Sequence, residues 1–287
     1  MRLRGFLAVV LAAVCGAPFA VRGQFSIAEQ FSASVITNRM GETLPVRVWR
    51  RYQPKDCPVP VVVLLHGSGE CGTDNAAQLT PFRSFYQTVL VDASLPPALY
   101  LIPQCTQRNG WVREVSFEAQ RRLPRYPAPA LRTVKEYLDA LVQQKVADPD
   151  RLYIGGYSLG GFGTWDAISR WPGYFAAAVP VCGGGAEQAE AVAHAAKTAV
   201  WAFHGAADAV VPVVCSRRMI AALGQAGVVP KYTEYPGAGH NIWVRAFGDS
   251  AMVRWMFRQR RGQVEQAPGT SAINAFFRQL KAYVTPD

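Results

Sequence analysis

Residues 59–67 read VPVVVLLHG, an unbroken apolar run that ends in a glycine. The run is rich in valine, which favours a strand, and its apolar side chains would point to both faces of a sheet. A strand of this kind must be covered on both faces, as it is in a parallel sheet between two layers of helices. The run therefore predicts an α/β fold.

After this run, β-forming segments alternate with helix-like segments. We expect strands at residues 99–103, 151–155, 176–181, 199–203 and 231–235, and helices at residues 76–91, 130–145, 160–170, 187–195, 216–226 and 251–260. Strands that alternate with helices form βαβ units, so the sheet is predicted to be mostly parallel and doubly wound.

Two other stretches depart from this alternation. Residues 31–37 and 44–52 flank a turn at Asn38–Gly41 and predict an antiparallel N-terminal hairpin. Residues 107–129 follow no period and are rich in arginine and proline, which indicates a long loop and a candidate substrate-facing insertion.

Residues 1–23 have the pattern of a secretory signal peptide. Arg2 and Arg4 precede an apolar run at residues 6–14, and small residues follow up to expected cleavage sites after Ala20 or Gly23. We therefore expect a secreted or periplasmic protein. The alternative is a single N-terminal anchor helix, for which the apolar run is short. No other segment is long and apolar enough to cross a membrane, so no stable membrane insertion is expected once the leader is removed.

The remaining chain is predicted to form one domain at residues 24–262. Half of all residues are hydrophobic and 17% are charged, which is typical of a globular protein. Without the three arginines of the leader, the formal net charge falls from +10 to about +7. Basic residues are spread along the chain apart from a cluster at Arg258, Arg260 and Arg261. That cluster is not interleaved with aromatic residues in a nucleic-acid pattern, so nucleic acid is not an expected partner. Residues 263–287 are expected to be a linker and an amphipathic helix that carries Ile273, Phe276, Phe277, Leu280 and Tyr283.

The segment Gly156-Tyr157-Ser158-Leu159-Gly160 matches the pattern G-x-S-x-G between a predicted strand and a predicted helix. In that setting the pattern predicts a sharp turn that exposes a nucleophilic serine. Glycines at positions 156 and 160 leave room for the neighbouring strand and helix. A flexible turn is the alternative interpretation, so the rest of the chain must decide between them.

A serine hydroxyl needs a base, and in this setting the acid and then the histidine follow the serine along the chain. The chain has four histidines: His66, His194, His204 and His240. His240 follows a glycine-rich turn and comes late enough for an acid to precede it. That acid is Asp208, in the loop after the predicted strand at 199–203.

The other acids in this part of the chain fall in or beside helices or in a strand: Asp166, Glu187, Glu190 and Glu234. Taken singly, Asp208 fits a helix cap and His240 a turn residue equally well. Their order and their places after successive strands together favour a Ser158–His240–Asp208 triad.

An oxyanion hole needs two amide donors near Ser158. The amide of Leu159 is one, because it opens the predicted helix. The second is expected in the loop LHGSGECGTDN at residues 65–75, where the amide of Ser68 lies between two glycines. His66 is expected to brace this loop.

Five cysteines follow the leader: Cys57, Cys71, Cys105, Cys182 and Cys215. Their spacing matches no zinc motif, so no metal site is expected. Disulfides are expected in an oxidising compartment, and an odd number leaves one thiol unpaired.

The motifs LLHGSGECGTDN, LIPQC, GGYSLGGFGTWD, FAAAVPVCGGG, HGAADAVVPV and GHNIWVRAF together resemble the α/β-hydrolase superfamily over residues 30–262. The chain looks most like a branch of secreted esterases and predicted peptidases. This branch is related to prolyl oligopeptidase catalytic domains, phospholipase/carboxylesterases and polyhydroxybutyrate-depolymerase-like feruloyl esterases. The resemblance implies a Ser158, Asp208 and His240 triad, acyl-enzyme chemistry and no cofactor.

The expected reaction is hydrolysis of a carboxylic ester, either small or linked to a polysaccharide. A peptidase or acyltransferase on the same triad is the alternative, and a non-catalytic binding protein on the same scaffold is a third interpretation. Trp111 and Trp243 suit an aromatic or sugar ligand, although plain packing explains them equally well. The fold implied by the resemblance also suggests disulfides Cys71–Cys105 and Cys182–Cys215, with Cys57 unpaired.

Overall fold

The computed structural model describes residues 27–108 and 110–266. The predicted leader and most of the predicted C-terminal segment lie outside the described residues. Within them, none of the helices combines the length and the hydropathy needed to span a bilayer. Gln266, at the end of the described chain, pairs with Val228 in an isolated antiparallel bridge.

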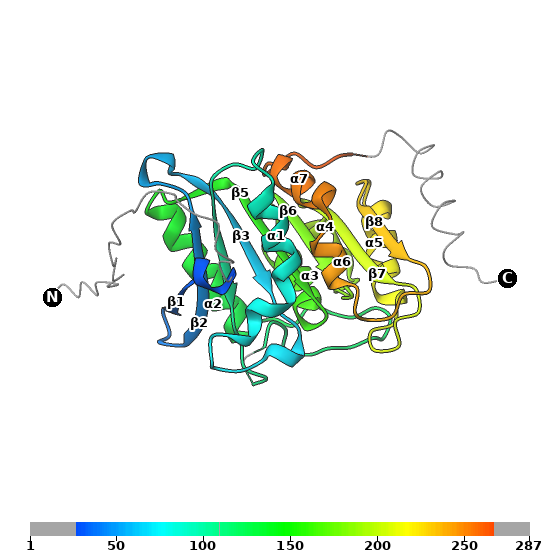
Figure 1. Cartoon of the computed structure of the whole chain (residues 1–287). Coiled ribbons are helices and arrows are strands. Elements are labelled where there is room, and N and C mark those ends of the chain that lie inside the picture. Colours follow the sequence, from blue (N-terminus) through cyan, green and yellow to red (C-terminus); the bar gives the residue numbers. More distant parts are fainter. Residues whose placement is uncertain (1–26, 109, 267–287) are drawn as a thin grey trace.

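Eight strands form one sheet, shown in Figure 1. They are β1 (Ser32–Thr37), β2 (Thr43–Arg51), β3 (Val59–Leu65), β4 (Ala98–Pro103), β5 (Ala147–Tyr157), β6 (Ala177–Val181), β7 (Ala199–Gly205) and β8 (Lys231–Tyr235). Their order is β1-β2-β4-β3-β5-β6-β7-β8. β1 and β2 form an antiparallel hairpin, β2 runs antiparallel to β4, and all the other neighbours are parallel. The predicted fold class, including the antiparallel hairpin, is confirmed.

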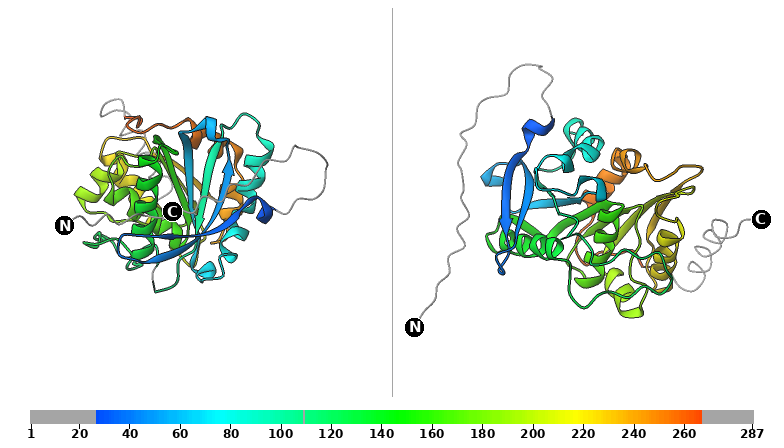
Figure 2. Two further views of the ribbon diagram at one scale, coloured as in Figure 1. Left: turned by 90° about the vertical axis from the view of Figure 1, so that its left-hand side faces the viewer. Right: turned by 90° about the horizontal axis from the view of Figure 1, so that it is seen from below.

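Helices cover both faces of this sheet (Figure 2). They are α1 (Arg83–Val91), α2 (Pro129–Gln143), α3 (Leu159–Arg170), α4 (Ala189–Ala195), α5 (Val214–Gln225), α6 (Trp243–Phe247) and α7 (Ser250–Arg258). α2, α3, α4 and α5 pack into one apolar cluster, whereas α1, α6 and α7 pack into the cluster on the other face.

The central strand β3 explains why both layers form. All seven of its residues are buried. Val61, Val63 and Leu65 belong to one cluster, and Val62 and Leu64 belong to the other. The period of two in a strand thus turns one apolar run into two cores, as the sequence predicted.

Two helices differ from the predictions. The helix expected at residues 76–91 is divided into a 3-10 helix at Ala77–Phe82 and then α1. Pro81 accounts for the division, because it lies inside the first part and cannot donate a backbone hydrogen bond. α6 was not predicted, since its five residues are too few to show a helical period.

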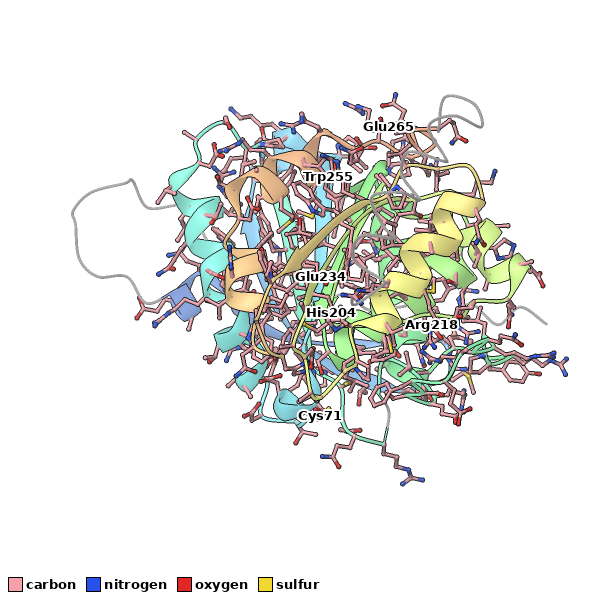
Figure 3. The ribbon with its side chains drawn as sticks, turned by 90° about the vertical axis from the view of Figure 1, so that its right-hand side faces the viewer. Cys71, His204, Arg218, Glu234, Trp255 and Glu265 are labelled. Atoms are coloured by element: carbon pink, nitrogen blue, oxygen red, sulfur yellow. The ribbon has the colours of Figure 1, made fainter. Side chains whose placement is uncertain are left out.

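The carboxyl ends of the parallel strands meet at one edge of the sheet. Leu65, Tyr157 and Gly205 end β3, β5 and β7 there, and each leads into a loop that carries a predicted site residue. Figure 3 shows Cys71 at this edge, with Trp255 and Glu265 at the opposite end of the molecule.

Candidate active site

Ser158 occupies a strained turn between β5 and α3. Its φ is 53° and its ψ is −118°, a backbone conformation that residues with a side chain rarely adopt. The Ser158 amide donates to the carbonyl of Val181 at 2.9 Å, which ties the turn to β6. A Cβ at Gly160 would collide with the carbonyl oxygen of Leu65, and a Cβ at Gly156 would collide with that of Gly160. Both glycines are therefore required for the close approach of strand and helix.

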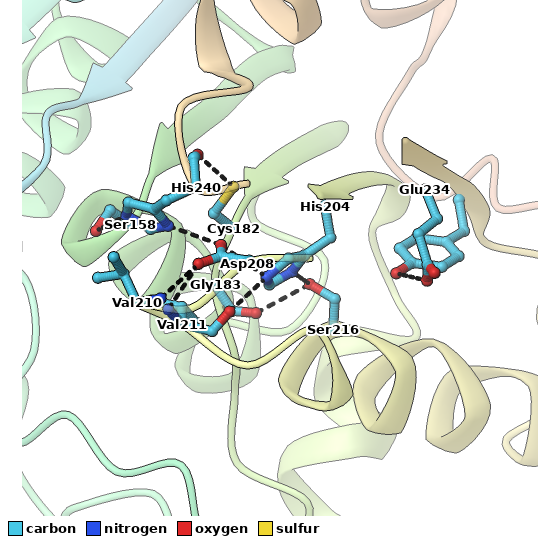
Figure 4. Close-up of polar contacts among 11 residues, drawn as sticks. Ser158, Cys182, Gly183, His204, Asp208, Val210, Val211, Ser216, Glu234 and His240 are labelled. Carbon is cyan, nitrogen blue, oxygen red and sulfur yellow. Dashed lines mark hydrogen bonds and ion pairs between the residues drawn. The ribbon is translucent and has the colours of Figure 1, made fainter. Parts of the chain in front are cut away.

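Three side chains from separate loops form a continuous hydrogen-bonded chain (Figure 4). Ser158 Oγ lies 3.0 Å from His240 Nε2, and His240 Nδ1 lies 2.7 Å from Asp208 Oδ2. An ionised carboxylate can only accept, so Nδ1 carries the hydrogen and Nε2 is free to take the proton of Ser158. The structure brings together the three residues that the sequence singled out, in the arrangement that activates a serine hydroxyl.

The Asp208 carboxylate is buried, and both of its oxygens have hydrogen-bond partners. Its Oδ1 accepts from the amides of Val210 and Val211, each at 2.9 Å. Its Oδ2 faces His204 Nε2 at 3.2 Å as well as His240. Burial by itself would raise the pKa of Asp208, but the hydrogen bonds from the two imidazoles and the two amides outweigh it. They hold the pKa well below its ordinary range, so the group is ionised at neutral pH.

The two predicted oxyanion donors come from different elements, α3 and the loop after β3. Leu159 is the first residue of α3, so its amide has no acceptor within the helix and lies at the positive end of the helix dipole. Ser68 opens a 3-10 turn, Ser68–Glu70, in the loop after β3, and is exposed.

His66 braces this loop through both ring nitrogens. Nδ1 donates to the carbonyl of Gly67 at 2.6 Å, and Nε2 accepts from the amide of Cys105 at 3.0 Å. These bonds fix a neutral tautomer in a fully buried ring. Burial accordingly lowers the pKa of His66 to about 4.

A second brace in the same loop went unnoticed in the sequence. The Tyr157 hydroxyl donates to the carboxylate of Glu70, and the Tyr157 ring stacks on Trp243 with 4.5 Å between centroids. A Cβ at Gly67 would lie 2.6 Å from the Tyr157 ring, so the ring packs directly beneath the loop. The only signal in the sequence was the position of Tyr157 next to Ser158.

The two tryptophans proposed for ligand contact have different surroundings. Trp243 is half-buried, and its ring lies edge-on to His240 with 5.8 Å between centroids, beside the hydrogen-bonded chain. Trp111 has no exposed surface, and its indole nitrogen donates to the carbonyl of His66 at 3.0 Å. Trp111 therefore supports the loop from within the core, and the expectation that it faces a ligand does not fit its position.

The predictions of disulfides Cys71–Cys105 and Cys182–Cys215 are wrong, because all five cysteines after the leader are free thiols. Cys71 and Cys105 do face each other, but their sulfurs are 3.8 Å apart, well beyond the roughly 2.05 Å of a disulfide bond. Cys182 instead donates to the carbonyl of His240 at 3.3 Å. Cys182 and Cys215 belong to different apolar clusters, and no disulfide joins them.

Among residues 27–108 and 110–266, two groups of side chains have ligand atoms close enough to hold a metal ion: His66, Cys71 and Cys105, and Cys182, Asp208 and His240. In the first group, both nitrogens of His66 already bond to backbone atoms. In the second group, Asp208 and His240 belong to the series of hydrogen bonds that leads to Ser158. Both sets of ligands thus have other partners in the fold.

An apolar rim, which we define as Phe117, Val210 and Val214, borders the site. These side chains are 42%, 58% and 41% exposed. The Phe117 ring lies 6.2 Å from that of Phe162, which packs with Leu159 next to Ser158. Phe117 thus lies on the α3 side of Ser158, whereas Val210 lies in the Asp208 loop and Val214 opens α5. Their exposed side chains offer apolar surface to a ligand.

The long loop that supplies Phe117 is held against α5. Arg218 donates to the carbonyl oxygens of Phe117 at 2.7 Å and of Glu118 at 3.2 Å. Further along, the Glu187 amide donates to the carbonyl of Arg121 at 2.9 Å. The predicted long loop is thus confirmed, and its contacts explain how it stays near Ser158 without regular structure.

Comparison with known proteins gives a family match and several relatives. Residues 52–252 match the model of the phospholipase/carboxylesterase family. The "Probable carboxylesterase SOBER1-like" of Arabidopsis thaliana is 27% identical over 197 residues, which cover 63% of this chain and 72% of that protein. Carboxylesterase SOBER1, also of Arabidopsis thaliana, is 26% identical over 198 residues, covering 63% and 83% of the two chains.

A solved structure is similar as well. The crystal structure of a thermostable esterase has a TM-score of 0.70 and 32% identity, and the match covers 82% of this chain. The chain spans 64% of that structure's length. The family match covers more than half of the chain and extends from the residue after β2 to beyond His240. Together with the carboxylesterase relatives and the parallel sheet with its antiparallel hairpin, it shows that the chain is a serine ester hydrolase of the phospholipase/carboxylesterase family.

Proposed function

We propose that the protein hydrolyses carboxylic esters through Ser158, His240 and Asp208. The observation that carries this proposal is the continuous chain of hydrogen bonds, 3.0 Å and 2.7 Å long, that ends on the strained Ser158. A serine with these partners is an activated nucleophile, whereas a binding protein would have no need to maintain the strain.

In the proposed reaction, His240 Nε2 takes the proton of Ser158 Oγ as the oxygen attacks the ester carbonyl carbon. The amides of Ser68 and Leu159 stabilise the negative charge of the tetrahedral intermediate. The imidazolium returns its proton to the departing alkoxide, which leaves an acyl group on Ser158. A water molecule then gives a proton to His240 as its oxygen attacks the acyl carbon. The imidazolium returns this proton to Ser158 Oγ as the acyl–oxygen bond breaks and the acid leaves, while Asp208 stays ionised and orients the ring.

The apolar rim supports an apolar acyl or alcohol group as the substrate portion next to Ser158. Trp243, half-buried beside His240, supports contact with an aromatic or sugar group at the other side. We therefore propose a small or polysaccharide-linked ester as the substrate class. Peptides and acyl acceptors belong in the same panel, because the triad chemistry serves them equally well.

A panel of p-nitrophenyl esters tests the apolar rim. We expect butanoate and octanoate esters to give higher kcat/KM than acetate. A Val214→Asp variant should lower kcat/KM for octanoate about tenfold while acetate changes little, because about 1.5 kcal/mol of apolar burial is lost. Val35→Asp is the matched control, since Val35 is 60% exposed on β1, far from the site in sequence and in the sheet. Equal losses for both esters would contradict the proposed surface.

Export is a separate proposal. The pattern at residues 1–23 supports a leader that is removed during secretion. N-terminal sequencing of the protein from the medium or periplasm should find a chain that begins after residue 20 or 23. An intact N-terminus on a membrane-bound protein would support the anchor instead.

A further inference from the structure

A second buried histidine contacts Asp208. His204 lies in β7 with no exposed surface, and its Nε2 is 3.2 Å from Asp208 Oδ2. The same oxygen accepts from His240 Nδ1 at 2.7 Å. Figure 4 shows Asp208 between the two imidazole rings.

The partners of His204 determine where its hydrogen lies. Nε2 faces the carbonyl of Val211 at 2.9 Å as well as the Asp208 carboxylate, and both can only accept, so Nε2 must carry a hydrogen. Nδ1 is 2.7 Å from Ser216 Oγ, which is 3.0 Å from the carbonyl of Gly183. If the single Ser216 proton goes to Nδ1, the ring is neutral; if it goes to Gly183, Nδ1 must also carry a hydrogen. In both arrangements His204 donates towards Asp208.

The charged surroundings favour the same arrangement. The titratable groups that face the ring, or bond to a group that does, are Asp208, His240, Cys182, Glu234, Arg217 and Tyr232. Glu234 lies opposite His204 in the β7–β8 register. Arg217 forms an ion pair with the Glu234 carboxylate at 2.6 Å. The site therefore places acceptors and carboxylates around His204, which stabilises a hydrogen on Nε2.

We propose that His204 is a positioning residue, which holds the Asp208 carboxylate so that Oδ2 remains in line with His240 Nδ1. The inference rests on the proposed function of Ser158, His240 and Asp208. A carboxylate held on Oδ2 by one imidazole alone would be freer to rotate, and the Val211 carbonyl would lose its donor inside the core. Because His204 acts through Asp208 and His240, its loss affects the chemical step more than substrate binding.

Three variants separate this role from packing. His204→Met keeps a side chain of similar length but has no donor, whereas His204→Gln can place an amide N–H near the position of Nε2. We expect His204→Met to lower kcat about 100-fold with KM nearly unchanged, as a misplaced catalytic group does. His204→Gln should stay within about tenfold of the parent, the effect of one weakened hydrogen bond. His194→Met is the matched control, since His194 lies on α4 and bonds to the carbonyl of Ser169 at 3.0 Å.

A spectroscopic measurement reports on position directly. The downfield proton resonance of the His240–Asp208 hydrogen bond should broaden or move in His204→Met and persist in His204→Gln, with thermal unfolding showing that both variants fold. If His204→Met does not fold, His204→Asn, whose amide ends short of the Nε2 position, takes its place. The proposal would be overturned if a folded His204→Met or His204→Asn variant kept the parental kcat and an unchanged resonance. It would also be overturned if His204→Gln had a kcat no higher than that of His204→Met.

The same resonance separates the two proposals. If the parent protein hydrolyses no ester while the resonance still depends on His204, the proposed function fails and the positioning role stands. If ester hydrolysis is present and independent of His204, only the positioning role fails.

Discussion

Gly160 faces the backbone of β3 at the point where the chain leaves Ser158. A side chain there has no room, because the obstacle is the Leu65 carbonyl, which belongs to a central strand and cannot move aside. Gly160→Ala should therefore lower the free energy of unfolding by about 3 kcal/mol, measured from the urea midpoint. Gly69→Ala is the control, since a Cβ at Gly69 meets nothing within 4 Å. Equal stability of the two variants would contradict the close approach.

His66 predicts how stability depends on pH. In the unfolded chain a histidine takes a proton near pH 6.5, but burial holds the pKa of folded His66 at about 4. Between these values the unfolded state binds more protons than the folded state, so the free energy of unfolding falls as pH falls. At pH 4 the loss from this group amounts to about 3 kcal/mol.

His66→Gln isolates that contribution, because glutamine can accept from the Cys105 amide but does not titrate. Urea unfolding at pH 7 and pH 4 should show a smaller drop in stability for His66→Gln than for the parent. An identical drop in both proteins would show that His66 is not the group responsible.

The loop after β3 and the end of β5 act together as one element of the site. The loop carries Ser68 and Glu70, and the Tyr157 side chain links it to Trp243 beside His240. Tyr157→Phe removes the hydroxyl that bonds to the Glu70 carboxylate and frees the loop. We expect kcat to fall about tenfold, the equivalent of one hydrogen bond to a charged group.

Tyr153→Phe is the matched control for this prediction. Tyr153 is on the same strand, but its hydroxyl donates at the other end, to the carbonyl of Gln259 at 3.1 Å. Its loss should change kcat little. Equal effects of the two substitutions would mean that the hydroxyl of Tyr157 has no special role in the loop.

At the scale of elements, strands were easier to predict than the contacts between loops. The apolar composition of residues 59–65 predicts burial on both faces of the strand. The glycines of the G-x-S-x-G pattern predict the strained turn at Ser158. The bond between His204 and Asp208 has no such signal, because it depends on the side-chain directions of a strand end and the loop that follows. The free state of the cysteines was missed for a similar reason. Cys71 was correctly expected near Cys105, but the positions of the two residues in the sequence do not determine the distance between their sulfur atoms.

At the scale of the whole molecule, the sheet order explains why residues far apart in sequence meet. β5 and β7 flank β6, so the loops after them place Ser158 and Asp208 near each other, and the turn after the neighbouring β8 brings His240 back. The order of serine, acid and histidine was expected from the setting of the G-x-S-x-G pattern, and the alternation of strands and helices placed each of these residues after a strand. The apolar rim was not, because it arises where a loop without periodicity packs against α5.

The central claim is that Ser158 is the nucleophile, and intact-protein mass after treatment with a fluorophosphonate tests it most directly. The parent protein should gain one phosphonyl group on Ser158, and Ser158→Ala should gain none and lose ester hydrolysis by at least about 10³-fold. A label on another residue, or a Ser158→Ala variant that hydrolyses esters at the parental rate, would contradict the account.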